Sequence, residues 1–105
     1  MIRSVYMIGI CGIAMGALAR MFRERGAAVS GSDRNIYPPM SDILREGGIT
    51  LHEGFDPSRI GDPDLVVIGN AVSRGNPEVE HVLNARLPYL SMAGALREFF
   101  LRDRE

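Results

Sequence analysis

The chain has 105 residues, of which 46% are hydrophobic and 24% are charged, and this size and balance are typical of one globular domain. The formal net charge of -1 argues against nucleic-acid and membrane partners, and no apolar run is long enough to span a bilayer. A single cysteine excludes an internal disulfide and favours the reducing cytoplasm. All twelve basic residues are arginine, so the chain lacks the lysine that a Walker-type loop places on the terminal phosphates of ATP.

Hydrophobic periodicity and turn residues predict strands that alternate with helices. In chain order, the predicted strands cover residues 3–8, 27–31, 49–52, 65–68 and 87–90, and the predicted helices cover residues 12–25, 41–46, 77–85 and 92–101. Residues 53–64 carry glycines and prolines and predict a loop with room for one helical turn. Alternation of this kind favours an α/β fold with right-handed crossovers. We therefore expect a Rossmann-like three-layer sandwich with a five-stranded parallel sheet in the order 3-2-1-4-5.

A glycine-rich turn joins the first predicted strand to the first predicted helix. Gly9 would allow a tight reversal, Gly12 would let a phosphate approach the backbone, and Gly16 would let the helix lie close to the strand. The dinucleotide fingerprint G-x-G-x-x-G/A places Cys11 where its middle glycine belongs, so the match is incomplete. Asp33 follows the second predicted strand, where an acid can bind ribose hydroxyls.

Ligands of such sheets bind beyond the carboxyl ends of the strands, where the strand order reverses. This rule brings together three loops, which cover residues 9–16, 32–35 and 69–74. They predict a nucleotide site without identifying the nucleotide. Arg74 is as consistent with a phosphate contact as with a solvated surface residue, and Cys11 is more typical of packing than of catalysis. No catalytic constellation and no metal-ligand spacing is present, so we predict neither.

Several functions remain compatible with these residues alone. They are the cofactor domain of a nicotinamide-dependent oxidoreductase, a nucleotide-sensing module, and a structural domain that binds nothing. Aspartate at position 33 is compatible with a nicotinamide dinucleotide, whereas the incomplete fingerprint argues against it.

Four segments resemble the N-terminal domain of the Mur ligases: residues 9–16, 31–33, 37–40 (Tyr-Pro-Pro-Met) and 68–77. The resemblance extends over essentially all of residues 1–105. It implies a domain that binds the UDP portion of UDP-N-acetylmuramic acid. A central domain would bind ATP and Mg²⁺ and phosphorylate the muramoyl carboxylate, and a C-terminal domain would supply the attacking amine. Both domains are absent from this chain, so we expect no cofactor in it and no activity from it alone.

The residues are most similar to the branch of the family that reattaches a whole tripeptide during peptidoglycan recycling. The branch that adds L-alanine usually has glycine at the position of Cys11 and is the nearest alternative. The resemblance also implies which residues bind UDP. The diphosphate would be held by backbone amides of Gly9, Ile10, Cys11, Gly12, Ile13, Ala14 and Met15, the uridine by Ser32 and Asp33, and the opposite side would be lined by Asn70, Ala71, Val72 and Ser73.

Overall fold

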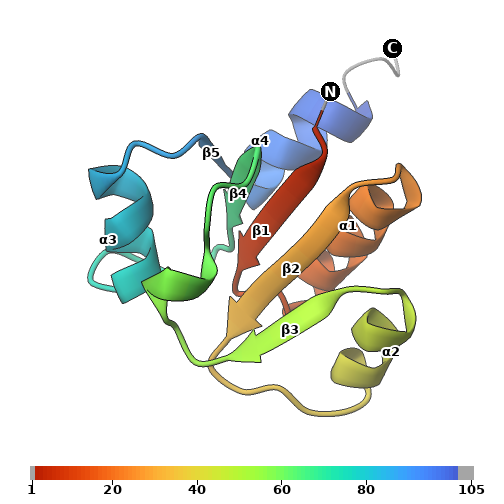
Figure 1. The fold of residues 1–105 in the computed structure, drawn as a ribbon. Helices are drawn as coiled ribbons and strands as arrows, with labels where there is room; N and C mark the ends of the chain where they lie inside the picture. Colours follow the sequence, from red (N-terminus) through yellow and green to blue (C-terminus); the bar gives the residue numbers. More distant parts are fainter. Residues whose placement is uncertain (1, 102–105) are drawn as a thin grey trace.

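The computed structural model describes residues 2–101 and contains one sheet of five parallel strands. The strands are β1 (Ser4–Ile8), β2 (Ala28–Asp33), β3 (Thr50–Glu53), β4 (Leu65–Ile68) and β5 (Tyr89–Ser91). Their order is β3-β2-β1-β4-β5, which confirms the predicted topology (Figure 1). β3 lies at one edge, while β1 pairs with β2 on one side and with β4 on the other.

Helices cover both faces of this sheet. They are α1 (Ile13–Glu24), α2 (Met40–Glu46), the 3-10 turn η1 (Pro57–Arg59), α3 (Pro77–Asn84), α4 (Met92–Leu96) and the π-helical turn η2 (Arg97–Leu101). α1, α2 and α4 lie on one face, and α3 and η1 lie on the other (Figure 1). The layers are those of a Rossmann-like sandwich, as the alternation of elements predicts.

The core consists of two apolar clusters, one on each face of β1. Val5 and Met7 belong to the cluster under α1, and Tyr6 and Ile8 belong to the cluster under α3. On α1 the buried positions include Met15, Leu18, Ala19 and Phe22, which recur three and four residues apart as the amphipathic pattern predicts. Because both faces of the sheet centre are covered, β4 and residues 5–8 of β1 are apolar throughout.

Most boundaries differ from the predicted ones by no more than one residue, and three differences are larger. β2 continues through Asp33 because its last residues still pair with β1 or β3. β5 begins at Tyr89 rather than at residue 87, because the chain first turns at Arg86, which has a left-handed φ of 56°. The last helix changes from α to π geometry after Leu96, where Arg25 donates a 2.7 Å hydrogen bond to the carbonyl oxygen of Phe99.

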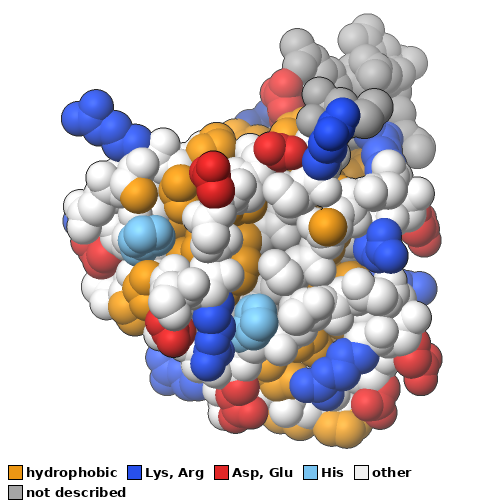
Figure 2. Space-filling view, viewed as in Figure 1, with side chains coloured by type: hydrophobic (Ala, Val, Ile, Leu, Met, Phe, Trp, Pro, Cys, Tyr) orange, Lys and Arg blue, Asp and Glu red, His pale blue; other side chains and the backbone are white. Residues whose placement is uncertain are grey.

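Charged side chains of both signs are interspersed over the face shown in Figure 2, and neither sign forms an extended patch there. Over residues 2–101, no helix combines the length and the apolar character that a bilayer crossing requires.

Candidate functional site

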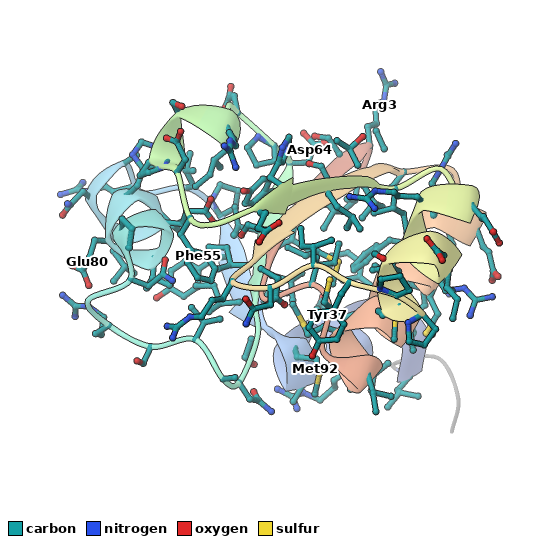
Figure 3. The ribbon with its side chains drawn as sticks, turned by 90° about the horizontal axis from the view of Figure 1, so that it is seen from below. Arg3, Tyr37, Phe55, Asp64, Glu80 and Met92 are labelled. Carbon is teal, nitrogen blue, oxygen red and sulfur yellow. The ribbon has the colours of Figure 1, made fainter. Side chains whose placement is uncertain are left out.

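An open cleft of about 1000 Å³ lies at the carboxyl ends of the strands. Its lining comes from the loops that follow β1, β2, β3, β4 and β5: Gly9, Cys11 to Met15, Asp33 to Asn35, Tyr37, Met40, Phe55, Gly69 to Ser73, Gly75 to Pro77, and Met92. Figure 3 looks onto this edge and shows Phe55 on the side of α3, with Tyr37 and Met92 toward α1 and α2. The topological switch between β1 and β4 thus lies within the cleft, where the strand order predicts a ligand.

The turn after β1 uses several of its own amides to hold its shape. Gly9 has a φ of +86°, a conformation that residues with a Cβ rarely adopt. The N–H groups of Gly9 and Ile10 both donate to the carbonyl oxygen of Ser32, at 2.8 and 3.0 Å. The N–H of Cys11 donates to Oδ2 of Asp33 at 2.9 Å. These three amides are therefore engaged within the protein.

The N–H of Gly12 donates to the carbonyl oxygen of Gly9 at 3.4 Å, and the three residues that follow line the cleft. Among residues 2–101, no acceptor is found for the N–H groups of Ile13, Ala14 and Met15 in the first turn of α1. Gly12 precedes them without a side chain that could cap them, and the first turn contains no acidic residue. α3 differs, because the side chain of Asn76 accepts hydrogen bonds from its first turn. Uncapped amides at the positive end of a 12-residue helix suit a negatively charged group.

Asp33 lies beside this helix end and is already hydrogen-bonded. Its Oδ2 accepts from Cys11, and its Oδ1 accepts from its neighbour Arg34 at 2.8 Å. Each carboxylate oxygen has a second lone pair, so the carboxylate retains capacity for hydroxyl donors from a ligand. An acid in this position at the end of β2 suits the ribose of a nucleotide whose phosphates lie at α1.

The structure places the predicted site residues in the cleft lining with two exceptions, Ile10 and Ser32. The side chain of Ile10 is fully buried against Gly31, and the hydroxyl of Ser32 donates to the carboxylate of Glu78. Neither side chain is available to a ligand in the cleft. Their contribution is indirect, because the carbonyl oxygen of Ser32 holds the turn.

The expected role of Gly16 is also different. A Cβ at Gly16 would lie 2.9 Å from Sδ of Met40, so this glycine allows α1 to approach α2 rather than the strand. The close approach of turn and strand occurs instead at Gly31 of β2, where a Cβ would lie 2.7 Å from Cδ1 of Ile10. The glycine that the fingerprint requires for packing is thus supplied by the neighbouring strand.

Some lining residues were not among the predicted site residues: Arg34, Asn35, Tyr37, Met40, Phe55, Gly69, Gly75, Asn76, Pro77 and Met92. Most follow strand ends, so the rule that selected the three loops could have extended to the ends of β3 and β5. Tyr37 is 66% exposed and Phe55 is half-buried, and they provide aromatic surfaces in different parts of the cleft (Figure 3).

The loop after β4 is held by side chains of α3. Arg74 forms two hydrogen bonds with the carboxylate of Glu80, at 2.7 and 3.1 Å, and Glu80 also accepts from the N–H of Gly75. Arg74 is therefore paired and does not line the cleft. The alternative in which Arg74 contacts a phosphate receives no support from this geometry.

Cys11 is the one cysteine of the chain and lines the cleft. Burial, together with the nearby charge of Asp33, raises the pKa of the Cys11 thiol, so the thiol stays protonated and is a poor nucleophile. No group of three or more His, Cys, Asp and Glu residues within 2–101 is arranged to hold a metal ion.

Known proteins share the sequence and the fold of this chain. A ligase from Escherichia coli (strain K12), UDP-N-acetylmuramate--L-alanyl-gamma-D-glutamyl-meso-2,6-diaminoheptandioate ligase, is 52% identical over 101 residues, which are 95% of this chain and 22% of that protein. A UDP-N-acetylmuramate--L-alanine ligase from Arthrobacter sp. (strain FB24) is 38% identical over 95% of this chain and 21% of its own length. The crystal structure of a murein peptide ligase from Psychrobacter arcticus superposes with a TM-score of 0.92 and 44% identity, over 97% of this chain and 22% of that one.

This chain thus spans about a fifth of the length of these relatives. The family model for the Mur ligase family, catalytic domain, matches residues 4–104, which include every strand and helix described above. The chain therefore belongs to the Mur ligase family.

Proposed function

We propose that this chain is the N-terminal domain of a longer ATP-dependent ligase and binds the UDP moiety of UDP-N-acetylmuramic acid. The complete enzyme would join the muramoyl carboxylate to the amino group of L-alanyl-γ-D-glutamyl-meso-diaminopimelate and form an amide bond in peptidoglycan recycling. The substrates in the names of the E. coli and Haemophilus influenzae relatives, which are 52% and 44% identical to this chain, support this assignment. We further propose that the enzyme acts in the cytoplasm.

The observation that carries the proposal is the pairing of uncapped amides with an acid. The N–H groups of Ile13, Ala14 and Met15 offer donors to a diphosphate, and Asp33 offers acceptors to the adjoining ribose. Asn70 and Ser73 line the same cleft and offer polar side chains to the rest of the nucleotide. The volume of the cleft, about 1000 Å³, is at the upper end of the usual range for small-molecule sites.

ATP and Mg²⁺ would be bound by other parts of the longer protein. This chain has no lysine, so its glycine turn cannot form a Walker-type phosphate loop. The described residues also lack a carboxylate cluster for Mg²⁺. The role of this domain is therefore to hold the nucleotide end of the substrate while the muramoyl group extends toward the chemistry.

Two alternative functions would use the same cleft. A ligase that adds L-alanine would use the same UDP site, and the lower identity to such a ligase, 38%, favours the tripeptide branch. A nicotinamide dinucleotide would also place phosphates at α1 and a ribose at Asp33.

Thermal denaturation of the chain with UDP-N-acetylmuramic acid, UDP, NADH or NADPH tests the proposal. A ligand that binds only the folded state at 100 times its Kd adds about 2.7 kcal/mol of stability, which for a domain of this size raises Tm by on the order of 10 °C. We expect this shift with the uridine compounds. A shift with NADH or NADPH and none with UDP would contradict the proposal.

A further inference from the structure

Glu78 is a fully buried carboxylate in the first turn of α3. Its Oε1 accepts from the hydroxyl of Ser32 at 2.5 Å, and its Oε2 accepts from the hydroxyl of Tyr6 at 2.8 Å and from the N–H of Asp56 at 2.9 Å. All three partners donate, and the two carboxylate oxygens together accept all three hydrogen bonds. Neither of the ion pairs found within residues 2–101 includes Glu78, so hydrogen bonds compensate for its burial.

Two of these partners, Ser32 and Asp56, lie beside segments that line the cleft. Ser32 holds the glycine turn, because its carbonyl oxygen accepts from the N–H groups of Gly9 and Ile10. Asp56 directly follows Phe55, which lines the cleft from the loop after β3.

Glu78 also orders its own end of α3. Its N–H donates to Oδ1 of Asn76, and Asn76 and Pro77 line the cleft as well. Through these contacts, one carboxylate joins β1, β2, the loop after β3 and the start of α3.

We propose that Glu78 is the positioning residue of the nucleotide cleft: it fixes the glycine turn, the Phe55 loop and the start of α3 at the separation that a nucleoside diphosphate requires. The inference rests on the proposed function. Glu78 does not line the cleft, so it acts only through its partners. A neutral or apolar residue of similar volume could fill the same space, but it could not accept from three donors at once.

Isothermal titration of the chain with UDP tests this role through Glu78→Gln. The amide has nearly the shape of the carboxylate, but its NH₂ group is a donor. It would meet groups that also donate at this site: the N–H of Asp56 and the hydroxyls of Ser32 and Tyr6. We expect a folded protein that binds UDP about 10-fold more weakly, because one buried hydrogen bond is lost and the segments it joins shift. Glu24→Gln makes the same chemical change at an exposed position at the end of α1 and should leave the Kd unchanged.

A second set of variants separates positioning from general stability. Ser32→Ala and Tyr6→Phe each remove one donor and keep the remaining shape. Ser32→Ala should weaken UDP binding, and the double variant Ser32→Ala/Glu78→Gln should bind little more weakly than Glu78→Gln, because both changes break one contact. A purely structural role would lower Tm but would leave the Kd of the folded molecules unchanged.

The outcomes are distinct. If the wild-type chain fails to bind UDP, the proposed function is wrong and this inference fails with it. If the wild-type chain binds UDP and Glu78→Gln binds equally well, only the inference is wrong. If Glu78→Gln does not fold, Ser32→Ala decides in its place, and an unchanged Kd in that variant overturns the inference.

Discussion

The Cα of Gly31 in β2 lies directly against the side chain of Ile10 in the glycine turn, and a Cβ at position 31 would lie 2.7 Å from Cδ1 of Ile10. It would also lie 2.5 Å from the carbonyl oxygen of Met7. Because backbone cannot move aside as a flexible side chain can, Gly31→Ala should lower the free energy of unfolding by about 3 kcal/mol. Urea denaturation measures this loss. A variant as stable as the wild type would show that the turn packs less tightly against β2 than described.

Gly12→Ala makes the same substitution at a glycine where a Cβ fits without a clash. Gly12 has a φ of -63°, and a Cβ there would meet nothing closer than 3.8 Å. The folded protein should keep its stability or gain about 0.5 kcal/mol from the stiffer unfolded chain. The new methyl group would, however, occupy the cleft beside the first amides of α1. We expect UDP affinity to fall about 10-fold or more. Retained affinity in this variant would argue that the diphosphate does not approach Gly12.

Asp33→Asn separates the ribose from the diphosphate. The amide can still accept from the N–H of Cys11, but it loses one of the two oxygens that a ribose hydroxyl could use. UDP should bind about 10-fold more weakly, whereas inorganic pyrophosphate should bind at least as well because a negative charge has been removed. Competition titrations with both ligands measure the difference. Equal losses for UDP and pyrophosphate would mean that Asp33 acts only by supporting the turn.

The sequence patterns predict the strand order and the buried face of α1, because both depend on local periodicity and on the handedness of crossovers. They also predict where the cleft lies, since the carboxyl ends of parallel strands share one edge. The role of Glu78 could not be predicted in this way. An acid in the first turn of a helix already has a local explanation in the helix dipole, and its partners Tyr6 and Ser32 are 72 and 46 residues away in the chain.

The same limit explains Gly31 and Ser32. The fingerprint assigns glycines within one turn, whereas the close contact with Ile10 depends on the register between β1 and β2. Ser32 follows Gly31 and precedes Asp33, so its position suggests a ligand contact. The strand alternation instead turns its side chain toward α3 and away from the cleft.

The ion pair of Arg74 and Glu80 predicts a specific titration. The hydrogen bonds from Arg74 lower the pKa of Glu80 from 4.5 to about 2. A lowered pKa in the folded state stabilises the protein above the unfolded value of 4.5, and this contribution is lost as pH falls toward about 2. NMR titration of the Glu80 carboxyl carbon should show a midpoint near 2, and Arg74→Gln should return it toward 4.5. A midpoint already near 4.5 in the wild type would mean that the pair does not form in solution.

The most direct test of the central claim is the response of the amide signals of Ile13, Ala14 and Met15 to UDP in two-dimensional ¹H–¹⁵N NMR spectra. These three N–H groups lack an acceptor within residues 2–101, so a bound diphosphate should give them larger shift changes than other amides of the chain. Uridine without phosphates should leave them nearly unchanged at the same concentration. If UDP binds and these three signals do not move, the diphosphate is not held by the first turn of α1, and the account of the cleft is wrong.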